Sequence, residues 1–218
     1  MEKGYGIELD VHLTSDKRLA VFHDDTLLRM CGDTRRIEDC TFDELSSLRL
    51  LDTDERIPSF SEILELVDGK VPLLIELKGT SLHDTELCDV IAPVLDRYAG
   101  DFVIESFNPL LLGKMKKIRP DFVRGQLVTA FRRRGVKLSR ARSFLLSSMM
   151  TNCISRPDFI AYDLEYPRSV SLFVTTKILG AKRCVWTARK ETVYREFIRK
   201  GDCPIFDSFD PKGDNENA

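Results

Sequence analysis

Short apolar runs rich in strand-forming residues alternate along most of the chain with stretches whose apolar residues recur at three- and four-residue steps. The short runs predict β-strands, and the longer stretches predict amphipathic helices. Eight strands are expected: Gly6–Val11, Leu19–His23, Pro72–Lys78, Phe102–Ser106, Val123–Val128, Phe159–Asp163, Arg183–Thr187 and Pro204–Asp207. Because strands that alternate with helices build repeated β/α units around a parallel sheet, the sequence predicts an α/β fold.

The helical period is clearest in four stretches: Ile63–Val67, Leu110–Ile118, Phe144–Met150 and Val193–Ile198. Ser59 and Ser61 are candidates for the N-cap of the first. The first two strands break the alternation, because the connection Thr14–Lys17 is too short for a crossover helix and therefore predicts a hairpin. Farther on, Thr41–Leu45 has the spacing of a capped helical turn.

The length of 218 residues fits one domain, since α/β barrels of roughly 200 to 250 residues are often single units. We expect a single barrel domain over residues 1–211. Residues 25–58 are polar and irregular, which predicts a loop or small insertion at the barrel mouth. The polar residues 212–218 are expected to form a flexible tail.

Composition and charge exclude several classes of protein. The formal net charge of −2 gives no reason to expect a nucleic-acid partner, and the basic stretch Arg132–Arg142 is typical of a solvated loop. There is no run of about 18 apolar residues, so stable membrane insertion is not expected. The six cysteines lack C-x-x-C pairs, and the start has no apolar signal-peptide core, which together predict reduced thiols and a cytoplasmic location. The oligomeric state is not encoded in any pattern.

Candidate chemistry begins in the first strand, where Glu8 and Asp10 are two residues apart. Side chains at this spacing lie on the same face of a strand. If that face is the inside of a barrel, two carboxylates are costly to bury unless a cation lies between them, and carboxylate oxygens suit calcium, magnesium or manganese. The alternative is a half-exposed strand with both acids facing water.

A second pair with the same spacing, Glu76 and Lys78, lies in the strand Pro72–Lys78, which is otherwise apolar. A strand this apolar is expected to be buried on both sides, so its charged residues are best placed where an active site opens at the strand ends. Glu76 would complete a three-carboxylate ion site. Lys78 would place a positive charge near an anion held by that ion.

His23 ends the second strand and is followed by Asp24 and Asp25, which could orient its imidazole. We interpret it as a general acid or base, with a structural core histidine as the alternative. His12 and His83 have no comparable setting and are expected to be surface residues.

Several segments, in this order, resemble the glycerophosphodiester phosphodiesterases: Gly6–Val11, Thr14–Lys17, Val21–Leu27, Ile57–Phe60, Ile75–Lys78, Glu105–Pro109, Val185–Thr187 and Ile205–Asp207. The resemblance covers nearly the whole chain. It implies a distorted (β/α)8 barrel of the TIM type. It also implies hydrolysis of small glycerophosphodiesters to glycerol 3-phosphate and an alcohol, with calcium or magnesium as the cofactor.

Transferred residue by residue, the resemblance assigns the metal ligands to Glu8, Asp10 and Glu76, and one catalytic histidine to His23. Lys78 matches a lysine next to the phosphate. Trp186 matches an aromatic residue that packs on the glycerol or the leaving group, although a lone tryptophan could equally belong to the core.

The sequence differs from the family pattern at its N-terminus. Family members carry a strand there that ends in His-Arg-Gly, followed by a helix. The expectation is therefore a barrel lacking its first strand and helix, with hydrolysis impaired because one catalytic histidine and one phosphate-binding arginine are missing. The alternative function is a non-catalytic barrel remnant that binds a divalent metal or a polyol phosphate.

Overall fold

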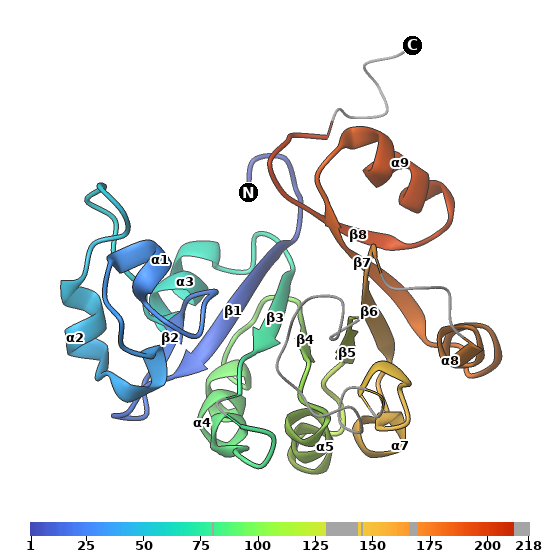
Figure 1. Cartoon of the computed structure of the whole chain (residues 1–218), viewed down its shortest axis with the longest axis horizontal. Helices are drawn as coiled ribbons and strands as arrows, with labels where there is room; N and C mark the ends of the chain where they lie inside the picture. Colours follow the sequence, from blue (N-terminus) through green and yellow to red (C-terminus); the bar gives the residue numbers. More distant parts are fainter. Residues whose placement is uncertain (80, 130–143, 145, 166–169, 212–218) are drawn as a thin grey trace. The chain divides into compact units, whose positions relative to one another are not determined.

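The computed structural model describes residues 1–79, 81–129, 144, 146–165 and 170–211 (Figure 1). The chain forms two compact units, Met1–Arg124 and Gly125–Ala218. The single domain expected over residues 1–211 stays a prediction. The basic stretch Arg132–Arg142 and the tail 212–218 lie outside the described residues, as does part of the helix expected at Phe144–Met150.

The first unit is built on four strands in the order β2-β1-β3-β4. These are β1 (Ile7–Leu13), β2 (Leu19–Val21), β3 (Leu73–Leu77) and β4 (Phe102–Ser106). β1 runs parallel to β3, and β3 runs parallel to β4, whereas β1 and β2 are antiparallel. The predicted hairpin is therefore confirmed.

Some helices of the first unit begin at side-chain caps. The helices of this unit are α1 (Leu28–Cys31), α2 (Phe42–Ser47), α3 (Phe60–Val67), α4 (Glu86–Leu95) and α5 (Pro109–Ile118), with a 3-10 turn η1 at Ile37–Asp39. Thr41 with Glu44 and Ser59 with Glu62 form capping boxes, in which each side chain satisfies a backbone N–H of the other. The capped turn predicted at Thr41–Leu45 is confirmed, and Ser59 is the cap of α3.

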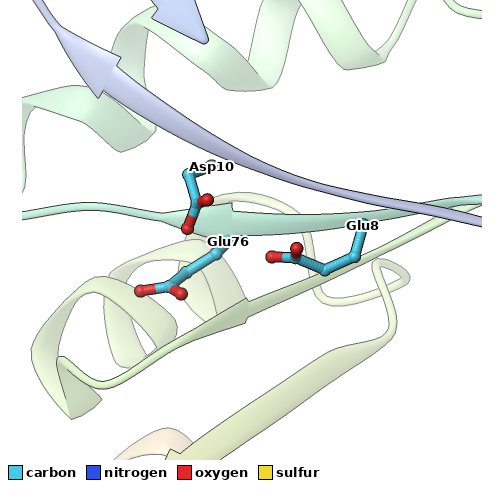
Figure 2. Close-up of side chains that lie close together, drawn as sticks. All are labelled: Glu8, Asp10 and Glu76. Carbon is cyan, nitrogen blue, oxygen red and sulfur yellow. The ribbon is translucent and has the colours of Figure 1, made fainter. Parts of the chain in front are cut away.

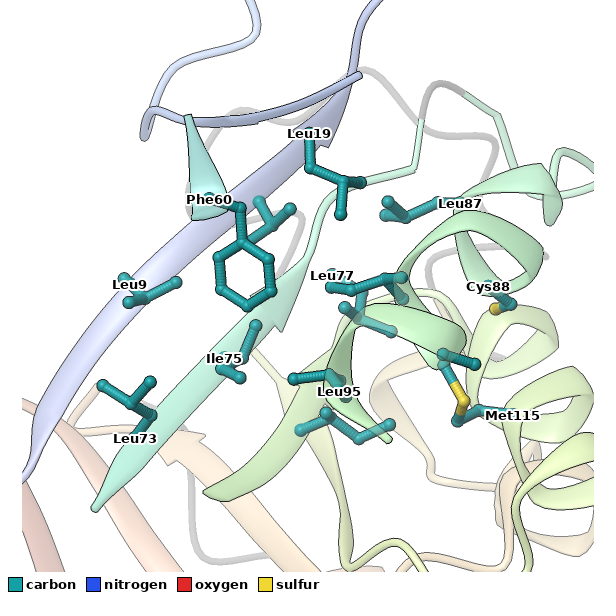
Figure 3. Packing of buried hydrophobic residues seen from close by; sticks show 14 of the residues in the cluster. Leu9, Leu19, Phe60, Leu73, Ile75, Leu77, Leu87, Cys88, Leu95 and Met115 are labelled. Carbon is teal, nitrogen blue, oxygen red and sulfur yellow. The ribbon is translucent and has the colours of Figure 1, made fainter. Parts of the chain in front are cut away.

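Alternation along the strands divides the sheet into an apolar face and a charged face. The odd-numbered residues of β1 and β3, including Leu9, Leu73 and Ile75, pack against residues of α3, α4 and α5 such as Phe60 and Leu95 (Figure 3). The even-numbered residues of the same strands therefore point to the other face. That face carries the candidate site.

The segment predicted as a loop or small insertion, residues 25–58, contains α1, η1 and α2. It also has a small core, whose fully buried members include Leu27, Ile37, Leu45 and Ile57. Its polar residues are half-buried or exposed. The segment is thus packed around apolar residues, and its description as a loop or small insertion at the barrel mouth stays a prediction.

The sheet of the second unit has four parallel strands in the order β5-β6-β7-β8, and β5 begins at the last residue of the first unit. They are β5 (Arg124–Val128), β6 (Phe159–Asp163), β7 (Lys182–Ala188) and β8 (Cys203–Phe206). The described helical segments are α7 (Asn152–Ser155), α8 (Val170–Phe173), the π-helix η2 (Val174–Ile178) and α9 (Glu191–Arg199). All eight strands predicted from the pattern are present in the two units. Among the described residues, no helix has both the length and the apolar character needed to span a membrane.

Candidate metal centre

Three carboxylates converge on the charged face of the first unit. Glu8 and Asp10 come from β1 and Glu76 from β3, and Asp10 is the register partner of Glu76 across the two parallel strands (Figure 2). One oxygen from each carboxylate lies within 4.8 Å of an oxygen from the other two. The strand alternation supplies the common face, and the parallel register brings the two strands into line. These are the three residues that the resemblance assigned to a metal.

Lys78 follows β3 directly, and its backbone N–H donates to the Val11 carbonyl at 3.0 Å, which continues the pairing with β1. Its ammonium group lies 2.9 Å from Asp10 Oδ1 and 2.9 Å from Glu76 Oε1, and the side chain is only 16% exposed. The predicted neighbourhood of Lys78 and the carboxylates is therefore present. When all four groups are ionised, the three carboxylates and the ammonium together carry two net negative charges. One divalent cation neutralises them.

Burial and mutual repulsion disfavour the charged forms of these acids. The pKa of Glu76 is raised from 4.5 to about 8, mainly by burial, while Lys78 opposes the shift. The pKa of Glu8 is raised to about 7, again mainly by burial and then by the Asp10 charge. Glu8 is an exposed residue, but the protein atoms around its carboxylate remove part of its hydration. The two acidic neighbours also help raise the pKa of Lys78.

Glu105 is a fourth carboxylate that the sequence reasoning did not single out. It is the register partner of Glu76 on β4, is only 1% exposed, and its Oε2 has no hydrogen-bond partner among the described residues. Burial first, and then Glu76, raise its pKa well above 4.5. Glu105 is an acid near the end of a mostly apolar run, but only the pairing of β4 with β3 places it beside Glu76.

His23 lies just beyond β2 and is largely exposed, with its Nδ1 2.7 Å from Asp24 Oδ1. Arg29 also binds Asp24, and these contacts lower the pKa of the Asp24 carboxyl to about 2. The acidic neighbour that the sequence placed beside His23 is therefore present and ionised. Phe22 N–H donates to the Asp10 carbonyl at 3.0 Å, so the backbone next to His23 is held to the strand that carries two of the carboxylates.

His12 was expected at the surface, and this expectation is wrong. It is only 4% exposed, because it follows Glu8 and Asp10 at the same two-residue spacing on β1 and faces the same way. Its imidazole makes a hydrogen bond with the backbone of His23, and burial lowers its pKa to about 4. A neutral imidazole thus supports the segment that carries His23.

Trp186 is half-buried on β7 of the second unit, where it is the register partner of Asp163. The carboxylates belong to the first unit. A contact between Trp186 and a substrate therefore stays a prediction.

The chemistry of the donor set fits a hard divalent cation. Carboxylate oxygens on neighbouring strands are the ligands that calcium, magnesium and manganese prefer, and three like charges this close are stabilised by a positive ion. The raised pKa values of Glu8 and Glu76 are what such a site should show without its ion. Glu8, Asp10 and Glu76 are the residues that would hold the cation.

Calcium affinity is expected to rise by about tenfold or more between pH 6 and pH 8.5. In this range the cation competes with protons on Glu8 and Glu76, whose pKa values are about 7 and about 8, so deprotonation at higher pH favours binding. Calorimetric titrations in two buffers of different ionisation enthalpy would count the released protons. Equal affinity and no proton release across this range would contradict the assignment.

Comparisons with known proteins point to one family. The family model described as "Glycerophosphoryl diester phosphodiesterase family" matches residues 2–210. The glycerophosphodiester phosphodiesterase of Caldanaerobacter subterraneus is 32% identical over 131 residues, which cover 56% of this chain and 54% of that protein. The chain spans about half the length of the first curated relatives that it matches.

Solved structures share the fold. A glycerophosphodiester phosphodiesterase from Parabacteroides distasonis is similar with a TM-score of 0.73 and 25% identity, over 94% of this chain and 81% of that one. A phosphodiesterase from Oleispira antarctica, solved with the product sn-glycerol-3-phosphate, has a TM-score of 0.72 and 22% identity, over 91% of this chain and 79% of that one. The α/β fold of the TIM-barrel type, which the sequence predicted, is therefore confirmed. With its carboxylate site on β1 and β3, the chain belongs to the glycerophosphoryl diester phosphodiesterase family.

Proposed function

We propose that this protein hydrolyses small glycerophosphodiesters to glycerol 3-phosphate and an alcohol, with a divalent cation at Glu8, Asp10 and Glu76. The observation that carries the proposal is the convergence of these three carboxylates with the Lys78 ammonium on one face of the sheet. The family match supports it, as does the product bound to the Oleispira antarctica phosphodiesterase.

The residues of the site would have two roles, neutralisation of charge on the phosphodiester and transfer of a proton. When bound, the cation would neutralise a phosphodiester oxygen and orient the ester. Lys78 would place a second positive charge beside the same phosphoryl group, in a site where little water screens it. His23, with Asp24 ionised at its Nδ1, would hold or accept a proton at the other ring nitrogen. The buried His12 would support the backbone of His23 through its hydrogen bond and take no part in proton transfer.

The direct test is hydrolysis of glycerophosphocholine by the purified chain, with release of glycerol 3-phosphate measured by a coupled enzyme assay. Calcium and magnesium are compared, and a chelator is added in a parallel reaction. We expect release that requires one of the two cations. Release that is unchanged by the chelator would contradict the metal assignment.

Replacing His23 with asparagine is expected to lower kcat by about a hundred- to ten-thousandfold, which is the usual contribution of a general acid or base. Asparagine keeps a polar side chain near Asp24, so the fold should be unaffected. The matched control is His83→Asn, because His83 is also exposed but lies before α4. If the two variants had equal kcat values, the role of His23 would be rejected.

A non-catalytic protein that binds a divalent cation or a polyol phosphate is the alternative. Calorimetry with calcium and glycerol 3-phosphate on the same preparation distinguishes the two. Binding without any hydrolysis would favour the alternative.

The proposal also places the protein in the cytoplasm, supported by six cysteines that form no disulfide bond in the structure.

A further inference from the structure

Two cysteines face each other across adjacent strands of the second unit. These strands contain none of the residues of the candidate metal centre. Cys184 on β7 is the register partner of Cys203, the first residue of β8. Neighbouring residues of paired strands have Cα atoms about 4.8 Å apart and side chains on the same face. That separation lies within the range of about 4.4 to 6.8 Å found in disulfides. The remaining four cysteines have no register partner among the described strand pairs.

The two thiols differ in their access to solvent. Cys203 is exposed, at the start of a strand whose only described neighbour is β7, whereas Cys184 is 5% exposed. A hydrogen bond from Cys184 lowers the pKa of Cys203 to about 6, against its ordinary value of 9.0. Cys203 is therefore the nucleophile of the pair at neutral pH, because the thiolate is the reactive form. Cys184 lies where it can react with an oxidised neighbour.

We propose that Cys184 and Cys203 form a reversible redox site that a small peroxide converts to a disulfide. The Cys203 thiolate attacks one oxygen of hydrogen peroxide, the O–O bond breaks, and the products are a sulfenic acid and hydroxide. The Cys184 thiol then attacks the Cys203 sulfur, an S–S bond forms, and the sulfenic oxygen leaves as water. Together the two thiols lose two electrons and two protons, and the peroxide becomes two waters. A dithiol reductant restores both thiols by exchange.

The structural consequence concerns α9. The segment between the two cysteines contains all of α9 (Glu191–Arg199), so the disulfide would close a loop around this helix. Such a link limits local opening of the segment. Oxidation is therefore expected to slow proteolytic cleavage within α9 at least severalfold.

The test is oxidation of the native chain with hydrogen peroxide, followed by alkylation of the remaining thiols and peptide mass spectrometry. We expect a Cys184–Cys203 cross-linked peptide that disappears on treatment with dithiothreitol. Cys203→Ser should abolish it, and this variant changes an exposed residue, so folding is retained. Cys153→Ser is the matched control, since Cys153 is also exposed and should leave the cross-link unchanged.

Two results would overturn the proposal. The first is oxidation of Cys203 to sulfinic acid while Cys184 stays reduced, which would mean that the thiols do not meet. The second is no change in either cysteine at peroxide concentrations that oxidise Cys153. Limited proteolysis of the oxidised and the reduced chain provides an independent readout. Equal cleavage rates within α9 would show that oxidation does not limit opening of this segment.

Discussion

Replacing Glu76 with glutamine is expected to lower the affinity for calcium by about a hundredfold or more and to abolish cation-dependent hydrolysis. The substitution keeps the shape of the side chain but removes one of three charges that face the cation. Even residues that only support metal ligands cost about 10- to 100-fold in affinity when mutated, so a direct ligand should cost at least as much. Glutamine also removes the ion pair with Lys78, whose ammonium lies 2.9 Å from Glu76 Oε1.

The measurement is calorimetric titration of calcium at pH 8.5, with hydrolysis assayed on the same samples. Glu65→Gln is the matched control, because it makes the same chemical change at an exposed position on α3. The control should bind calcium as the wild type does. If Glu76→Gln bound calcium with unchanged affinity, Glu76 would not be a ligand.

Replacing Lys78 with methionine is expected to destabilise the cation-free chain by about 3–5 kcal/mol at pH 8.5, as breaking a buried ion pair typically does. Lys78 is the cationic partner of Asp10 and Glu76, so its removal leaves buried carboxylates uncompensated. The loss should be smaller at pH 6, because Glu76, with a pKa of about 8, is then protonated. Calcium should restore stability, since it supplies the missing positive charge.

Urea unfolding with and without calcium measures this effect. Lys70→Met is the control, because the Lys70 ammonium lies 3.7 Å from Asp68 in an exposed pair, and exposed pairs contribute about 0–1 kcal/mol. Calcium should raise the free energy of unfolding more for Lys78→Met than for either the control or the wild type. An equal effect of calcium on all three would show that Lys78 does not share a site with the cation.

The faces of the site were predictable from the sequence because they depend only on strand alternation. Glu8 with Asp10, and Glu76 with Lys78, are pairs at a two-residue spacing within runs that form strands whatever lies around them. That β1 and β3 are neighbours in exact register is not contained in this spacing. The family resemblance supplied the set of ligand residues, and the structure supplied the register.

Tertiary context decided the residues that were missed or misplaced. Glu105 has no charged neighbour at a two-residue spacing, so only the pairing of β4 with β3 reveals that it adjoins Glu76. His12 follows the same alternation as Glu8 and Asp10, but an imidazole is common at surfaces, and its burial results from the packing around β1 and His23.

Some boundaries of the helices and strands were predictable from the sequence, and others were not. β4 and β6 begin and end as predicted, because each apolar run follows an aspartate and closes on a polar residue. The strand expected at Leu19–His23 is shorter, since β2 ends at Val21 and the backbone turns toward Asp24. α4 was not assigned from its period, and Pro93 within it interrupts the usual helical signal.

Anomalous diffraction from crystals of this chain grown with manganese tests the central claim most directly. Manganese takes oxygen ligands as calcium and magnesium do, and its anomalous signal locates the ion without any assumption about activity. The expected result is a peak bounded by the carboxylates of Glu8, Asp10 and Glu76, which is absent from crystals of Glu76→Gln. A wild-type crystal that shows no peak there, or that shows manganese only at other carboxylates, would contradict the account.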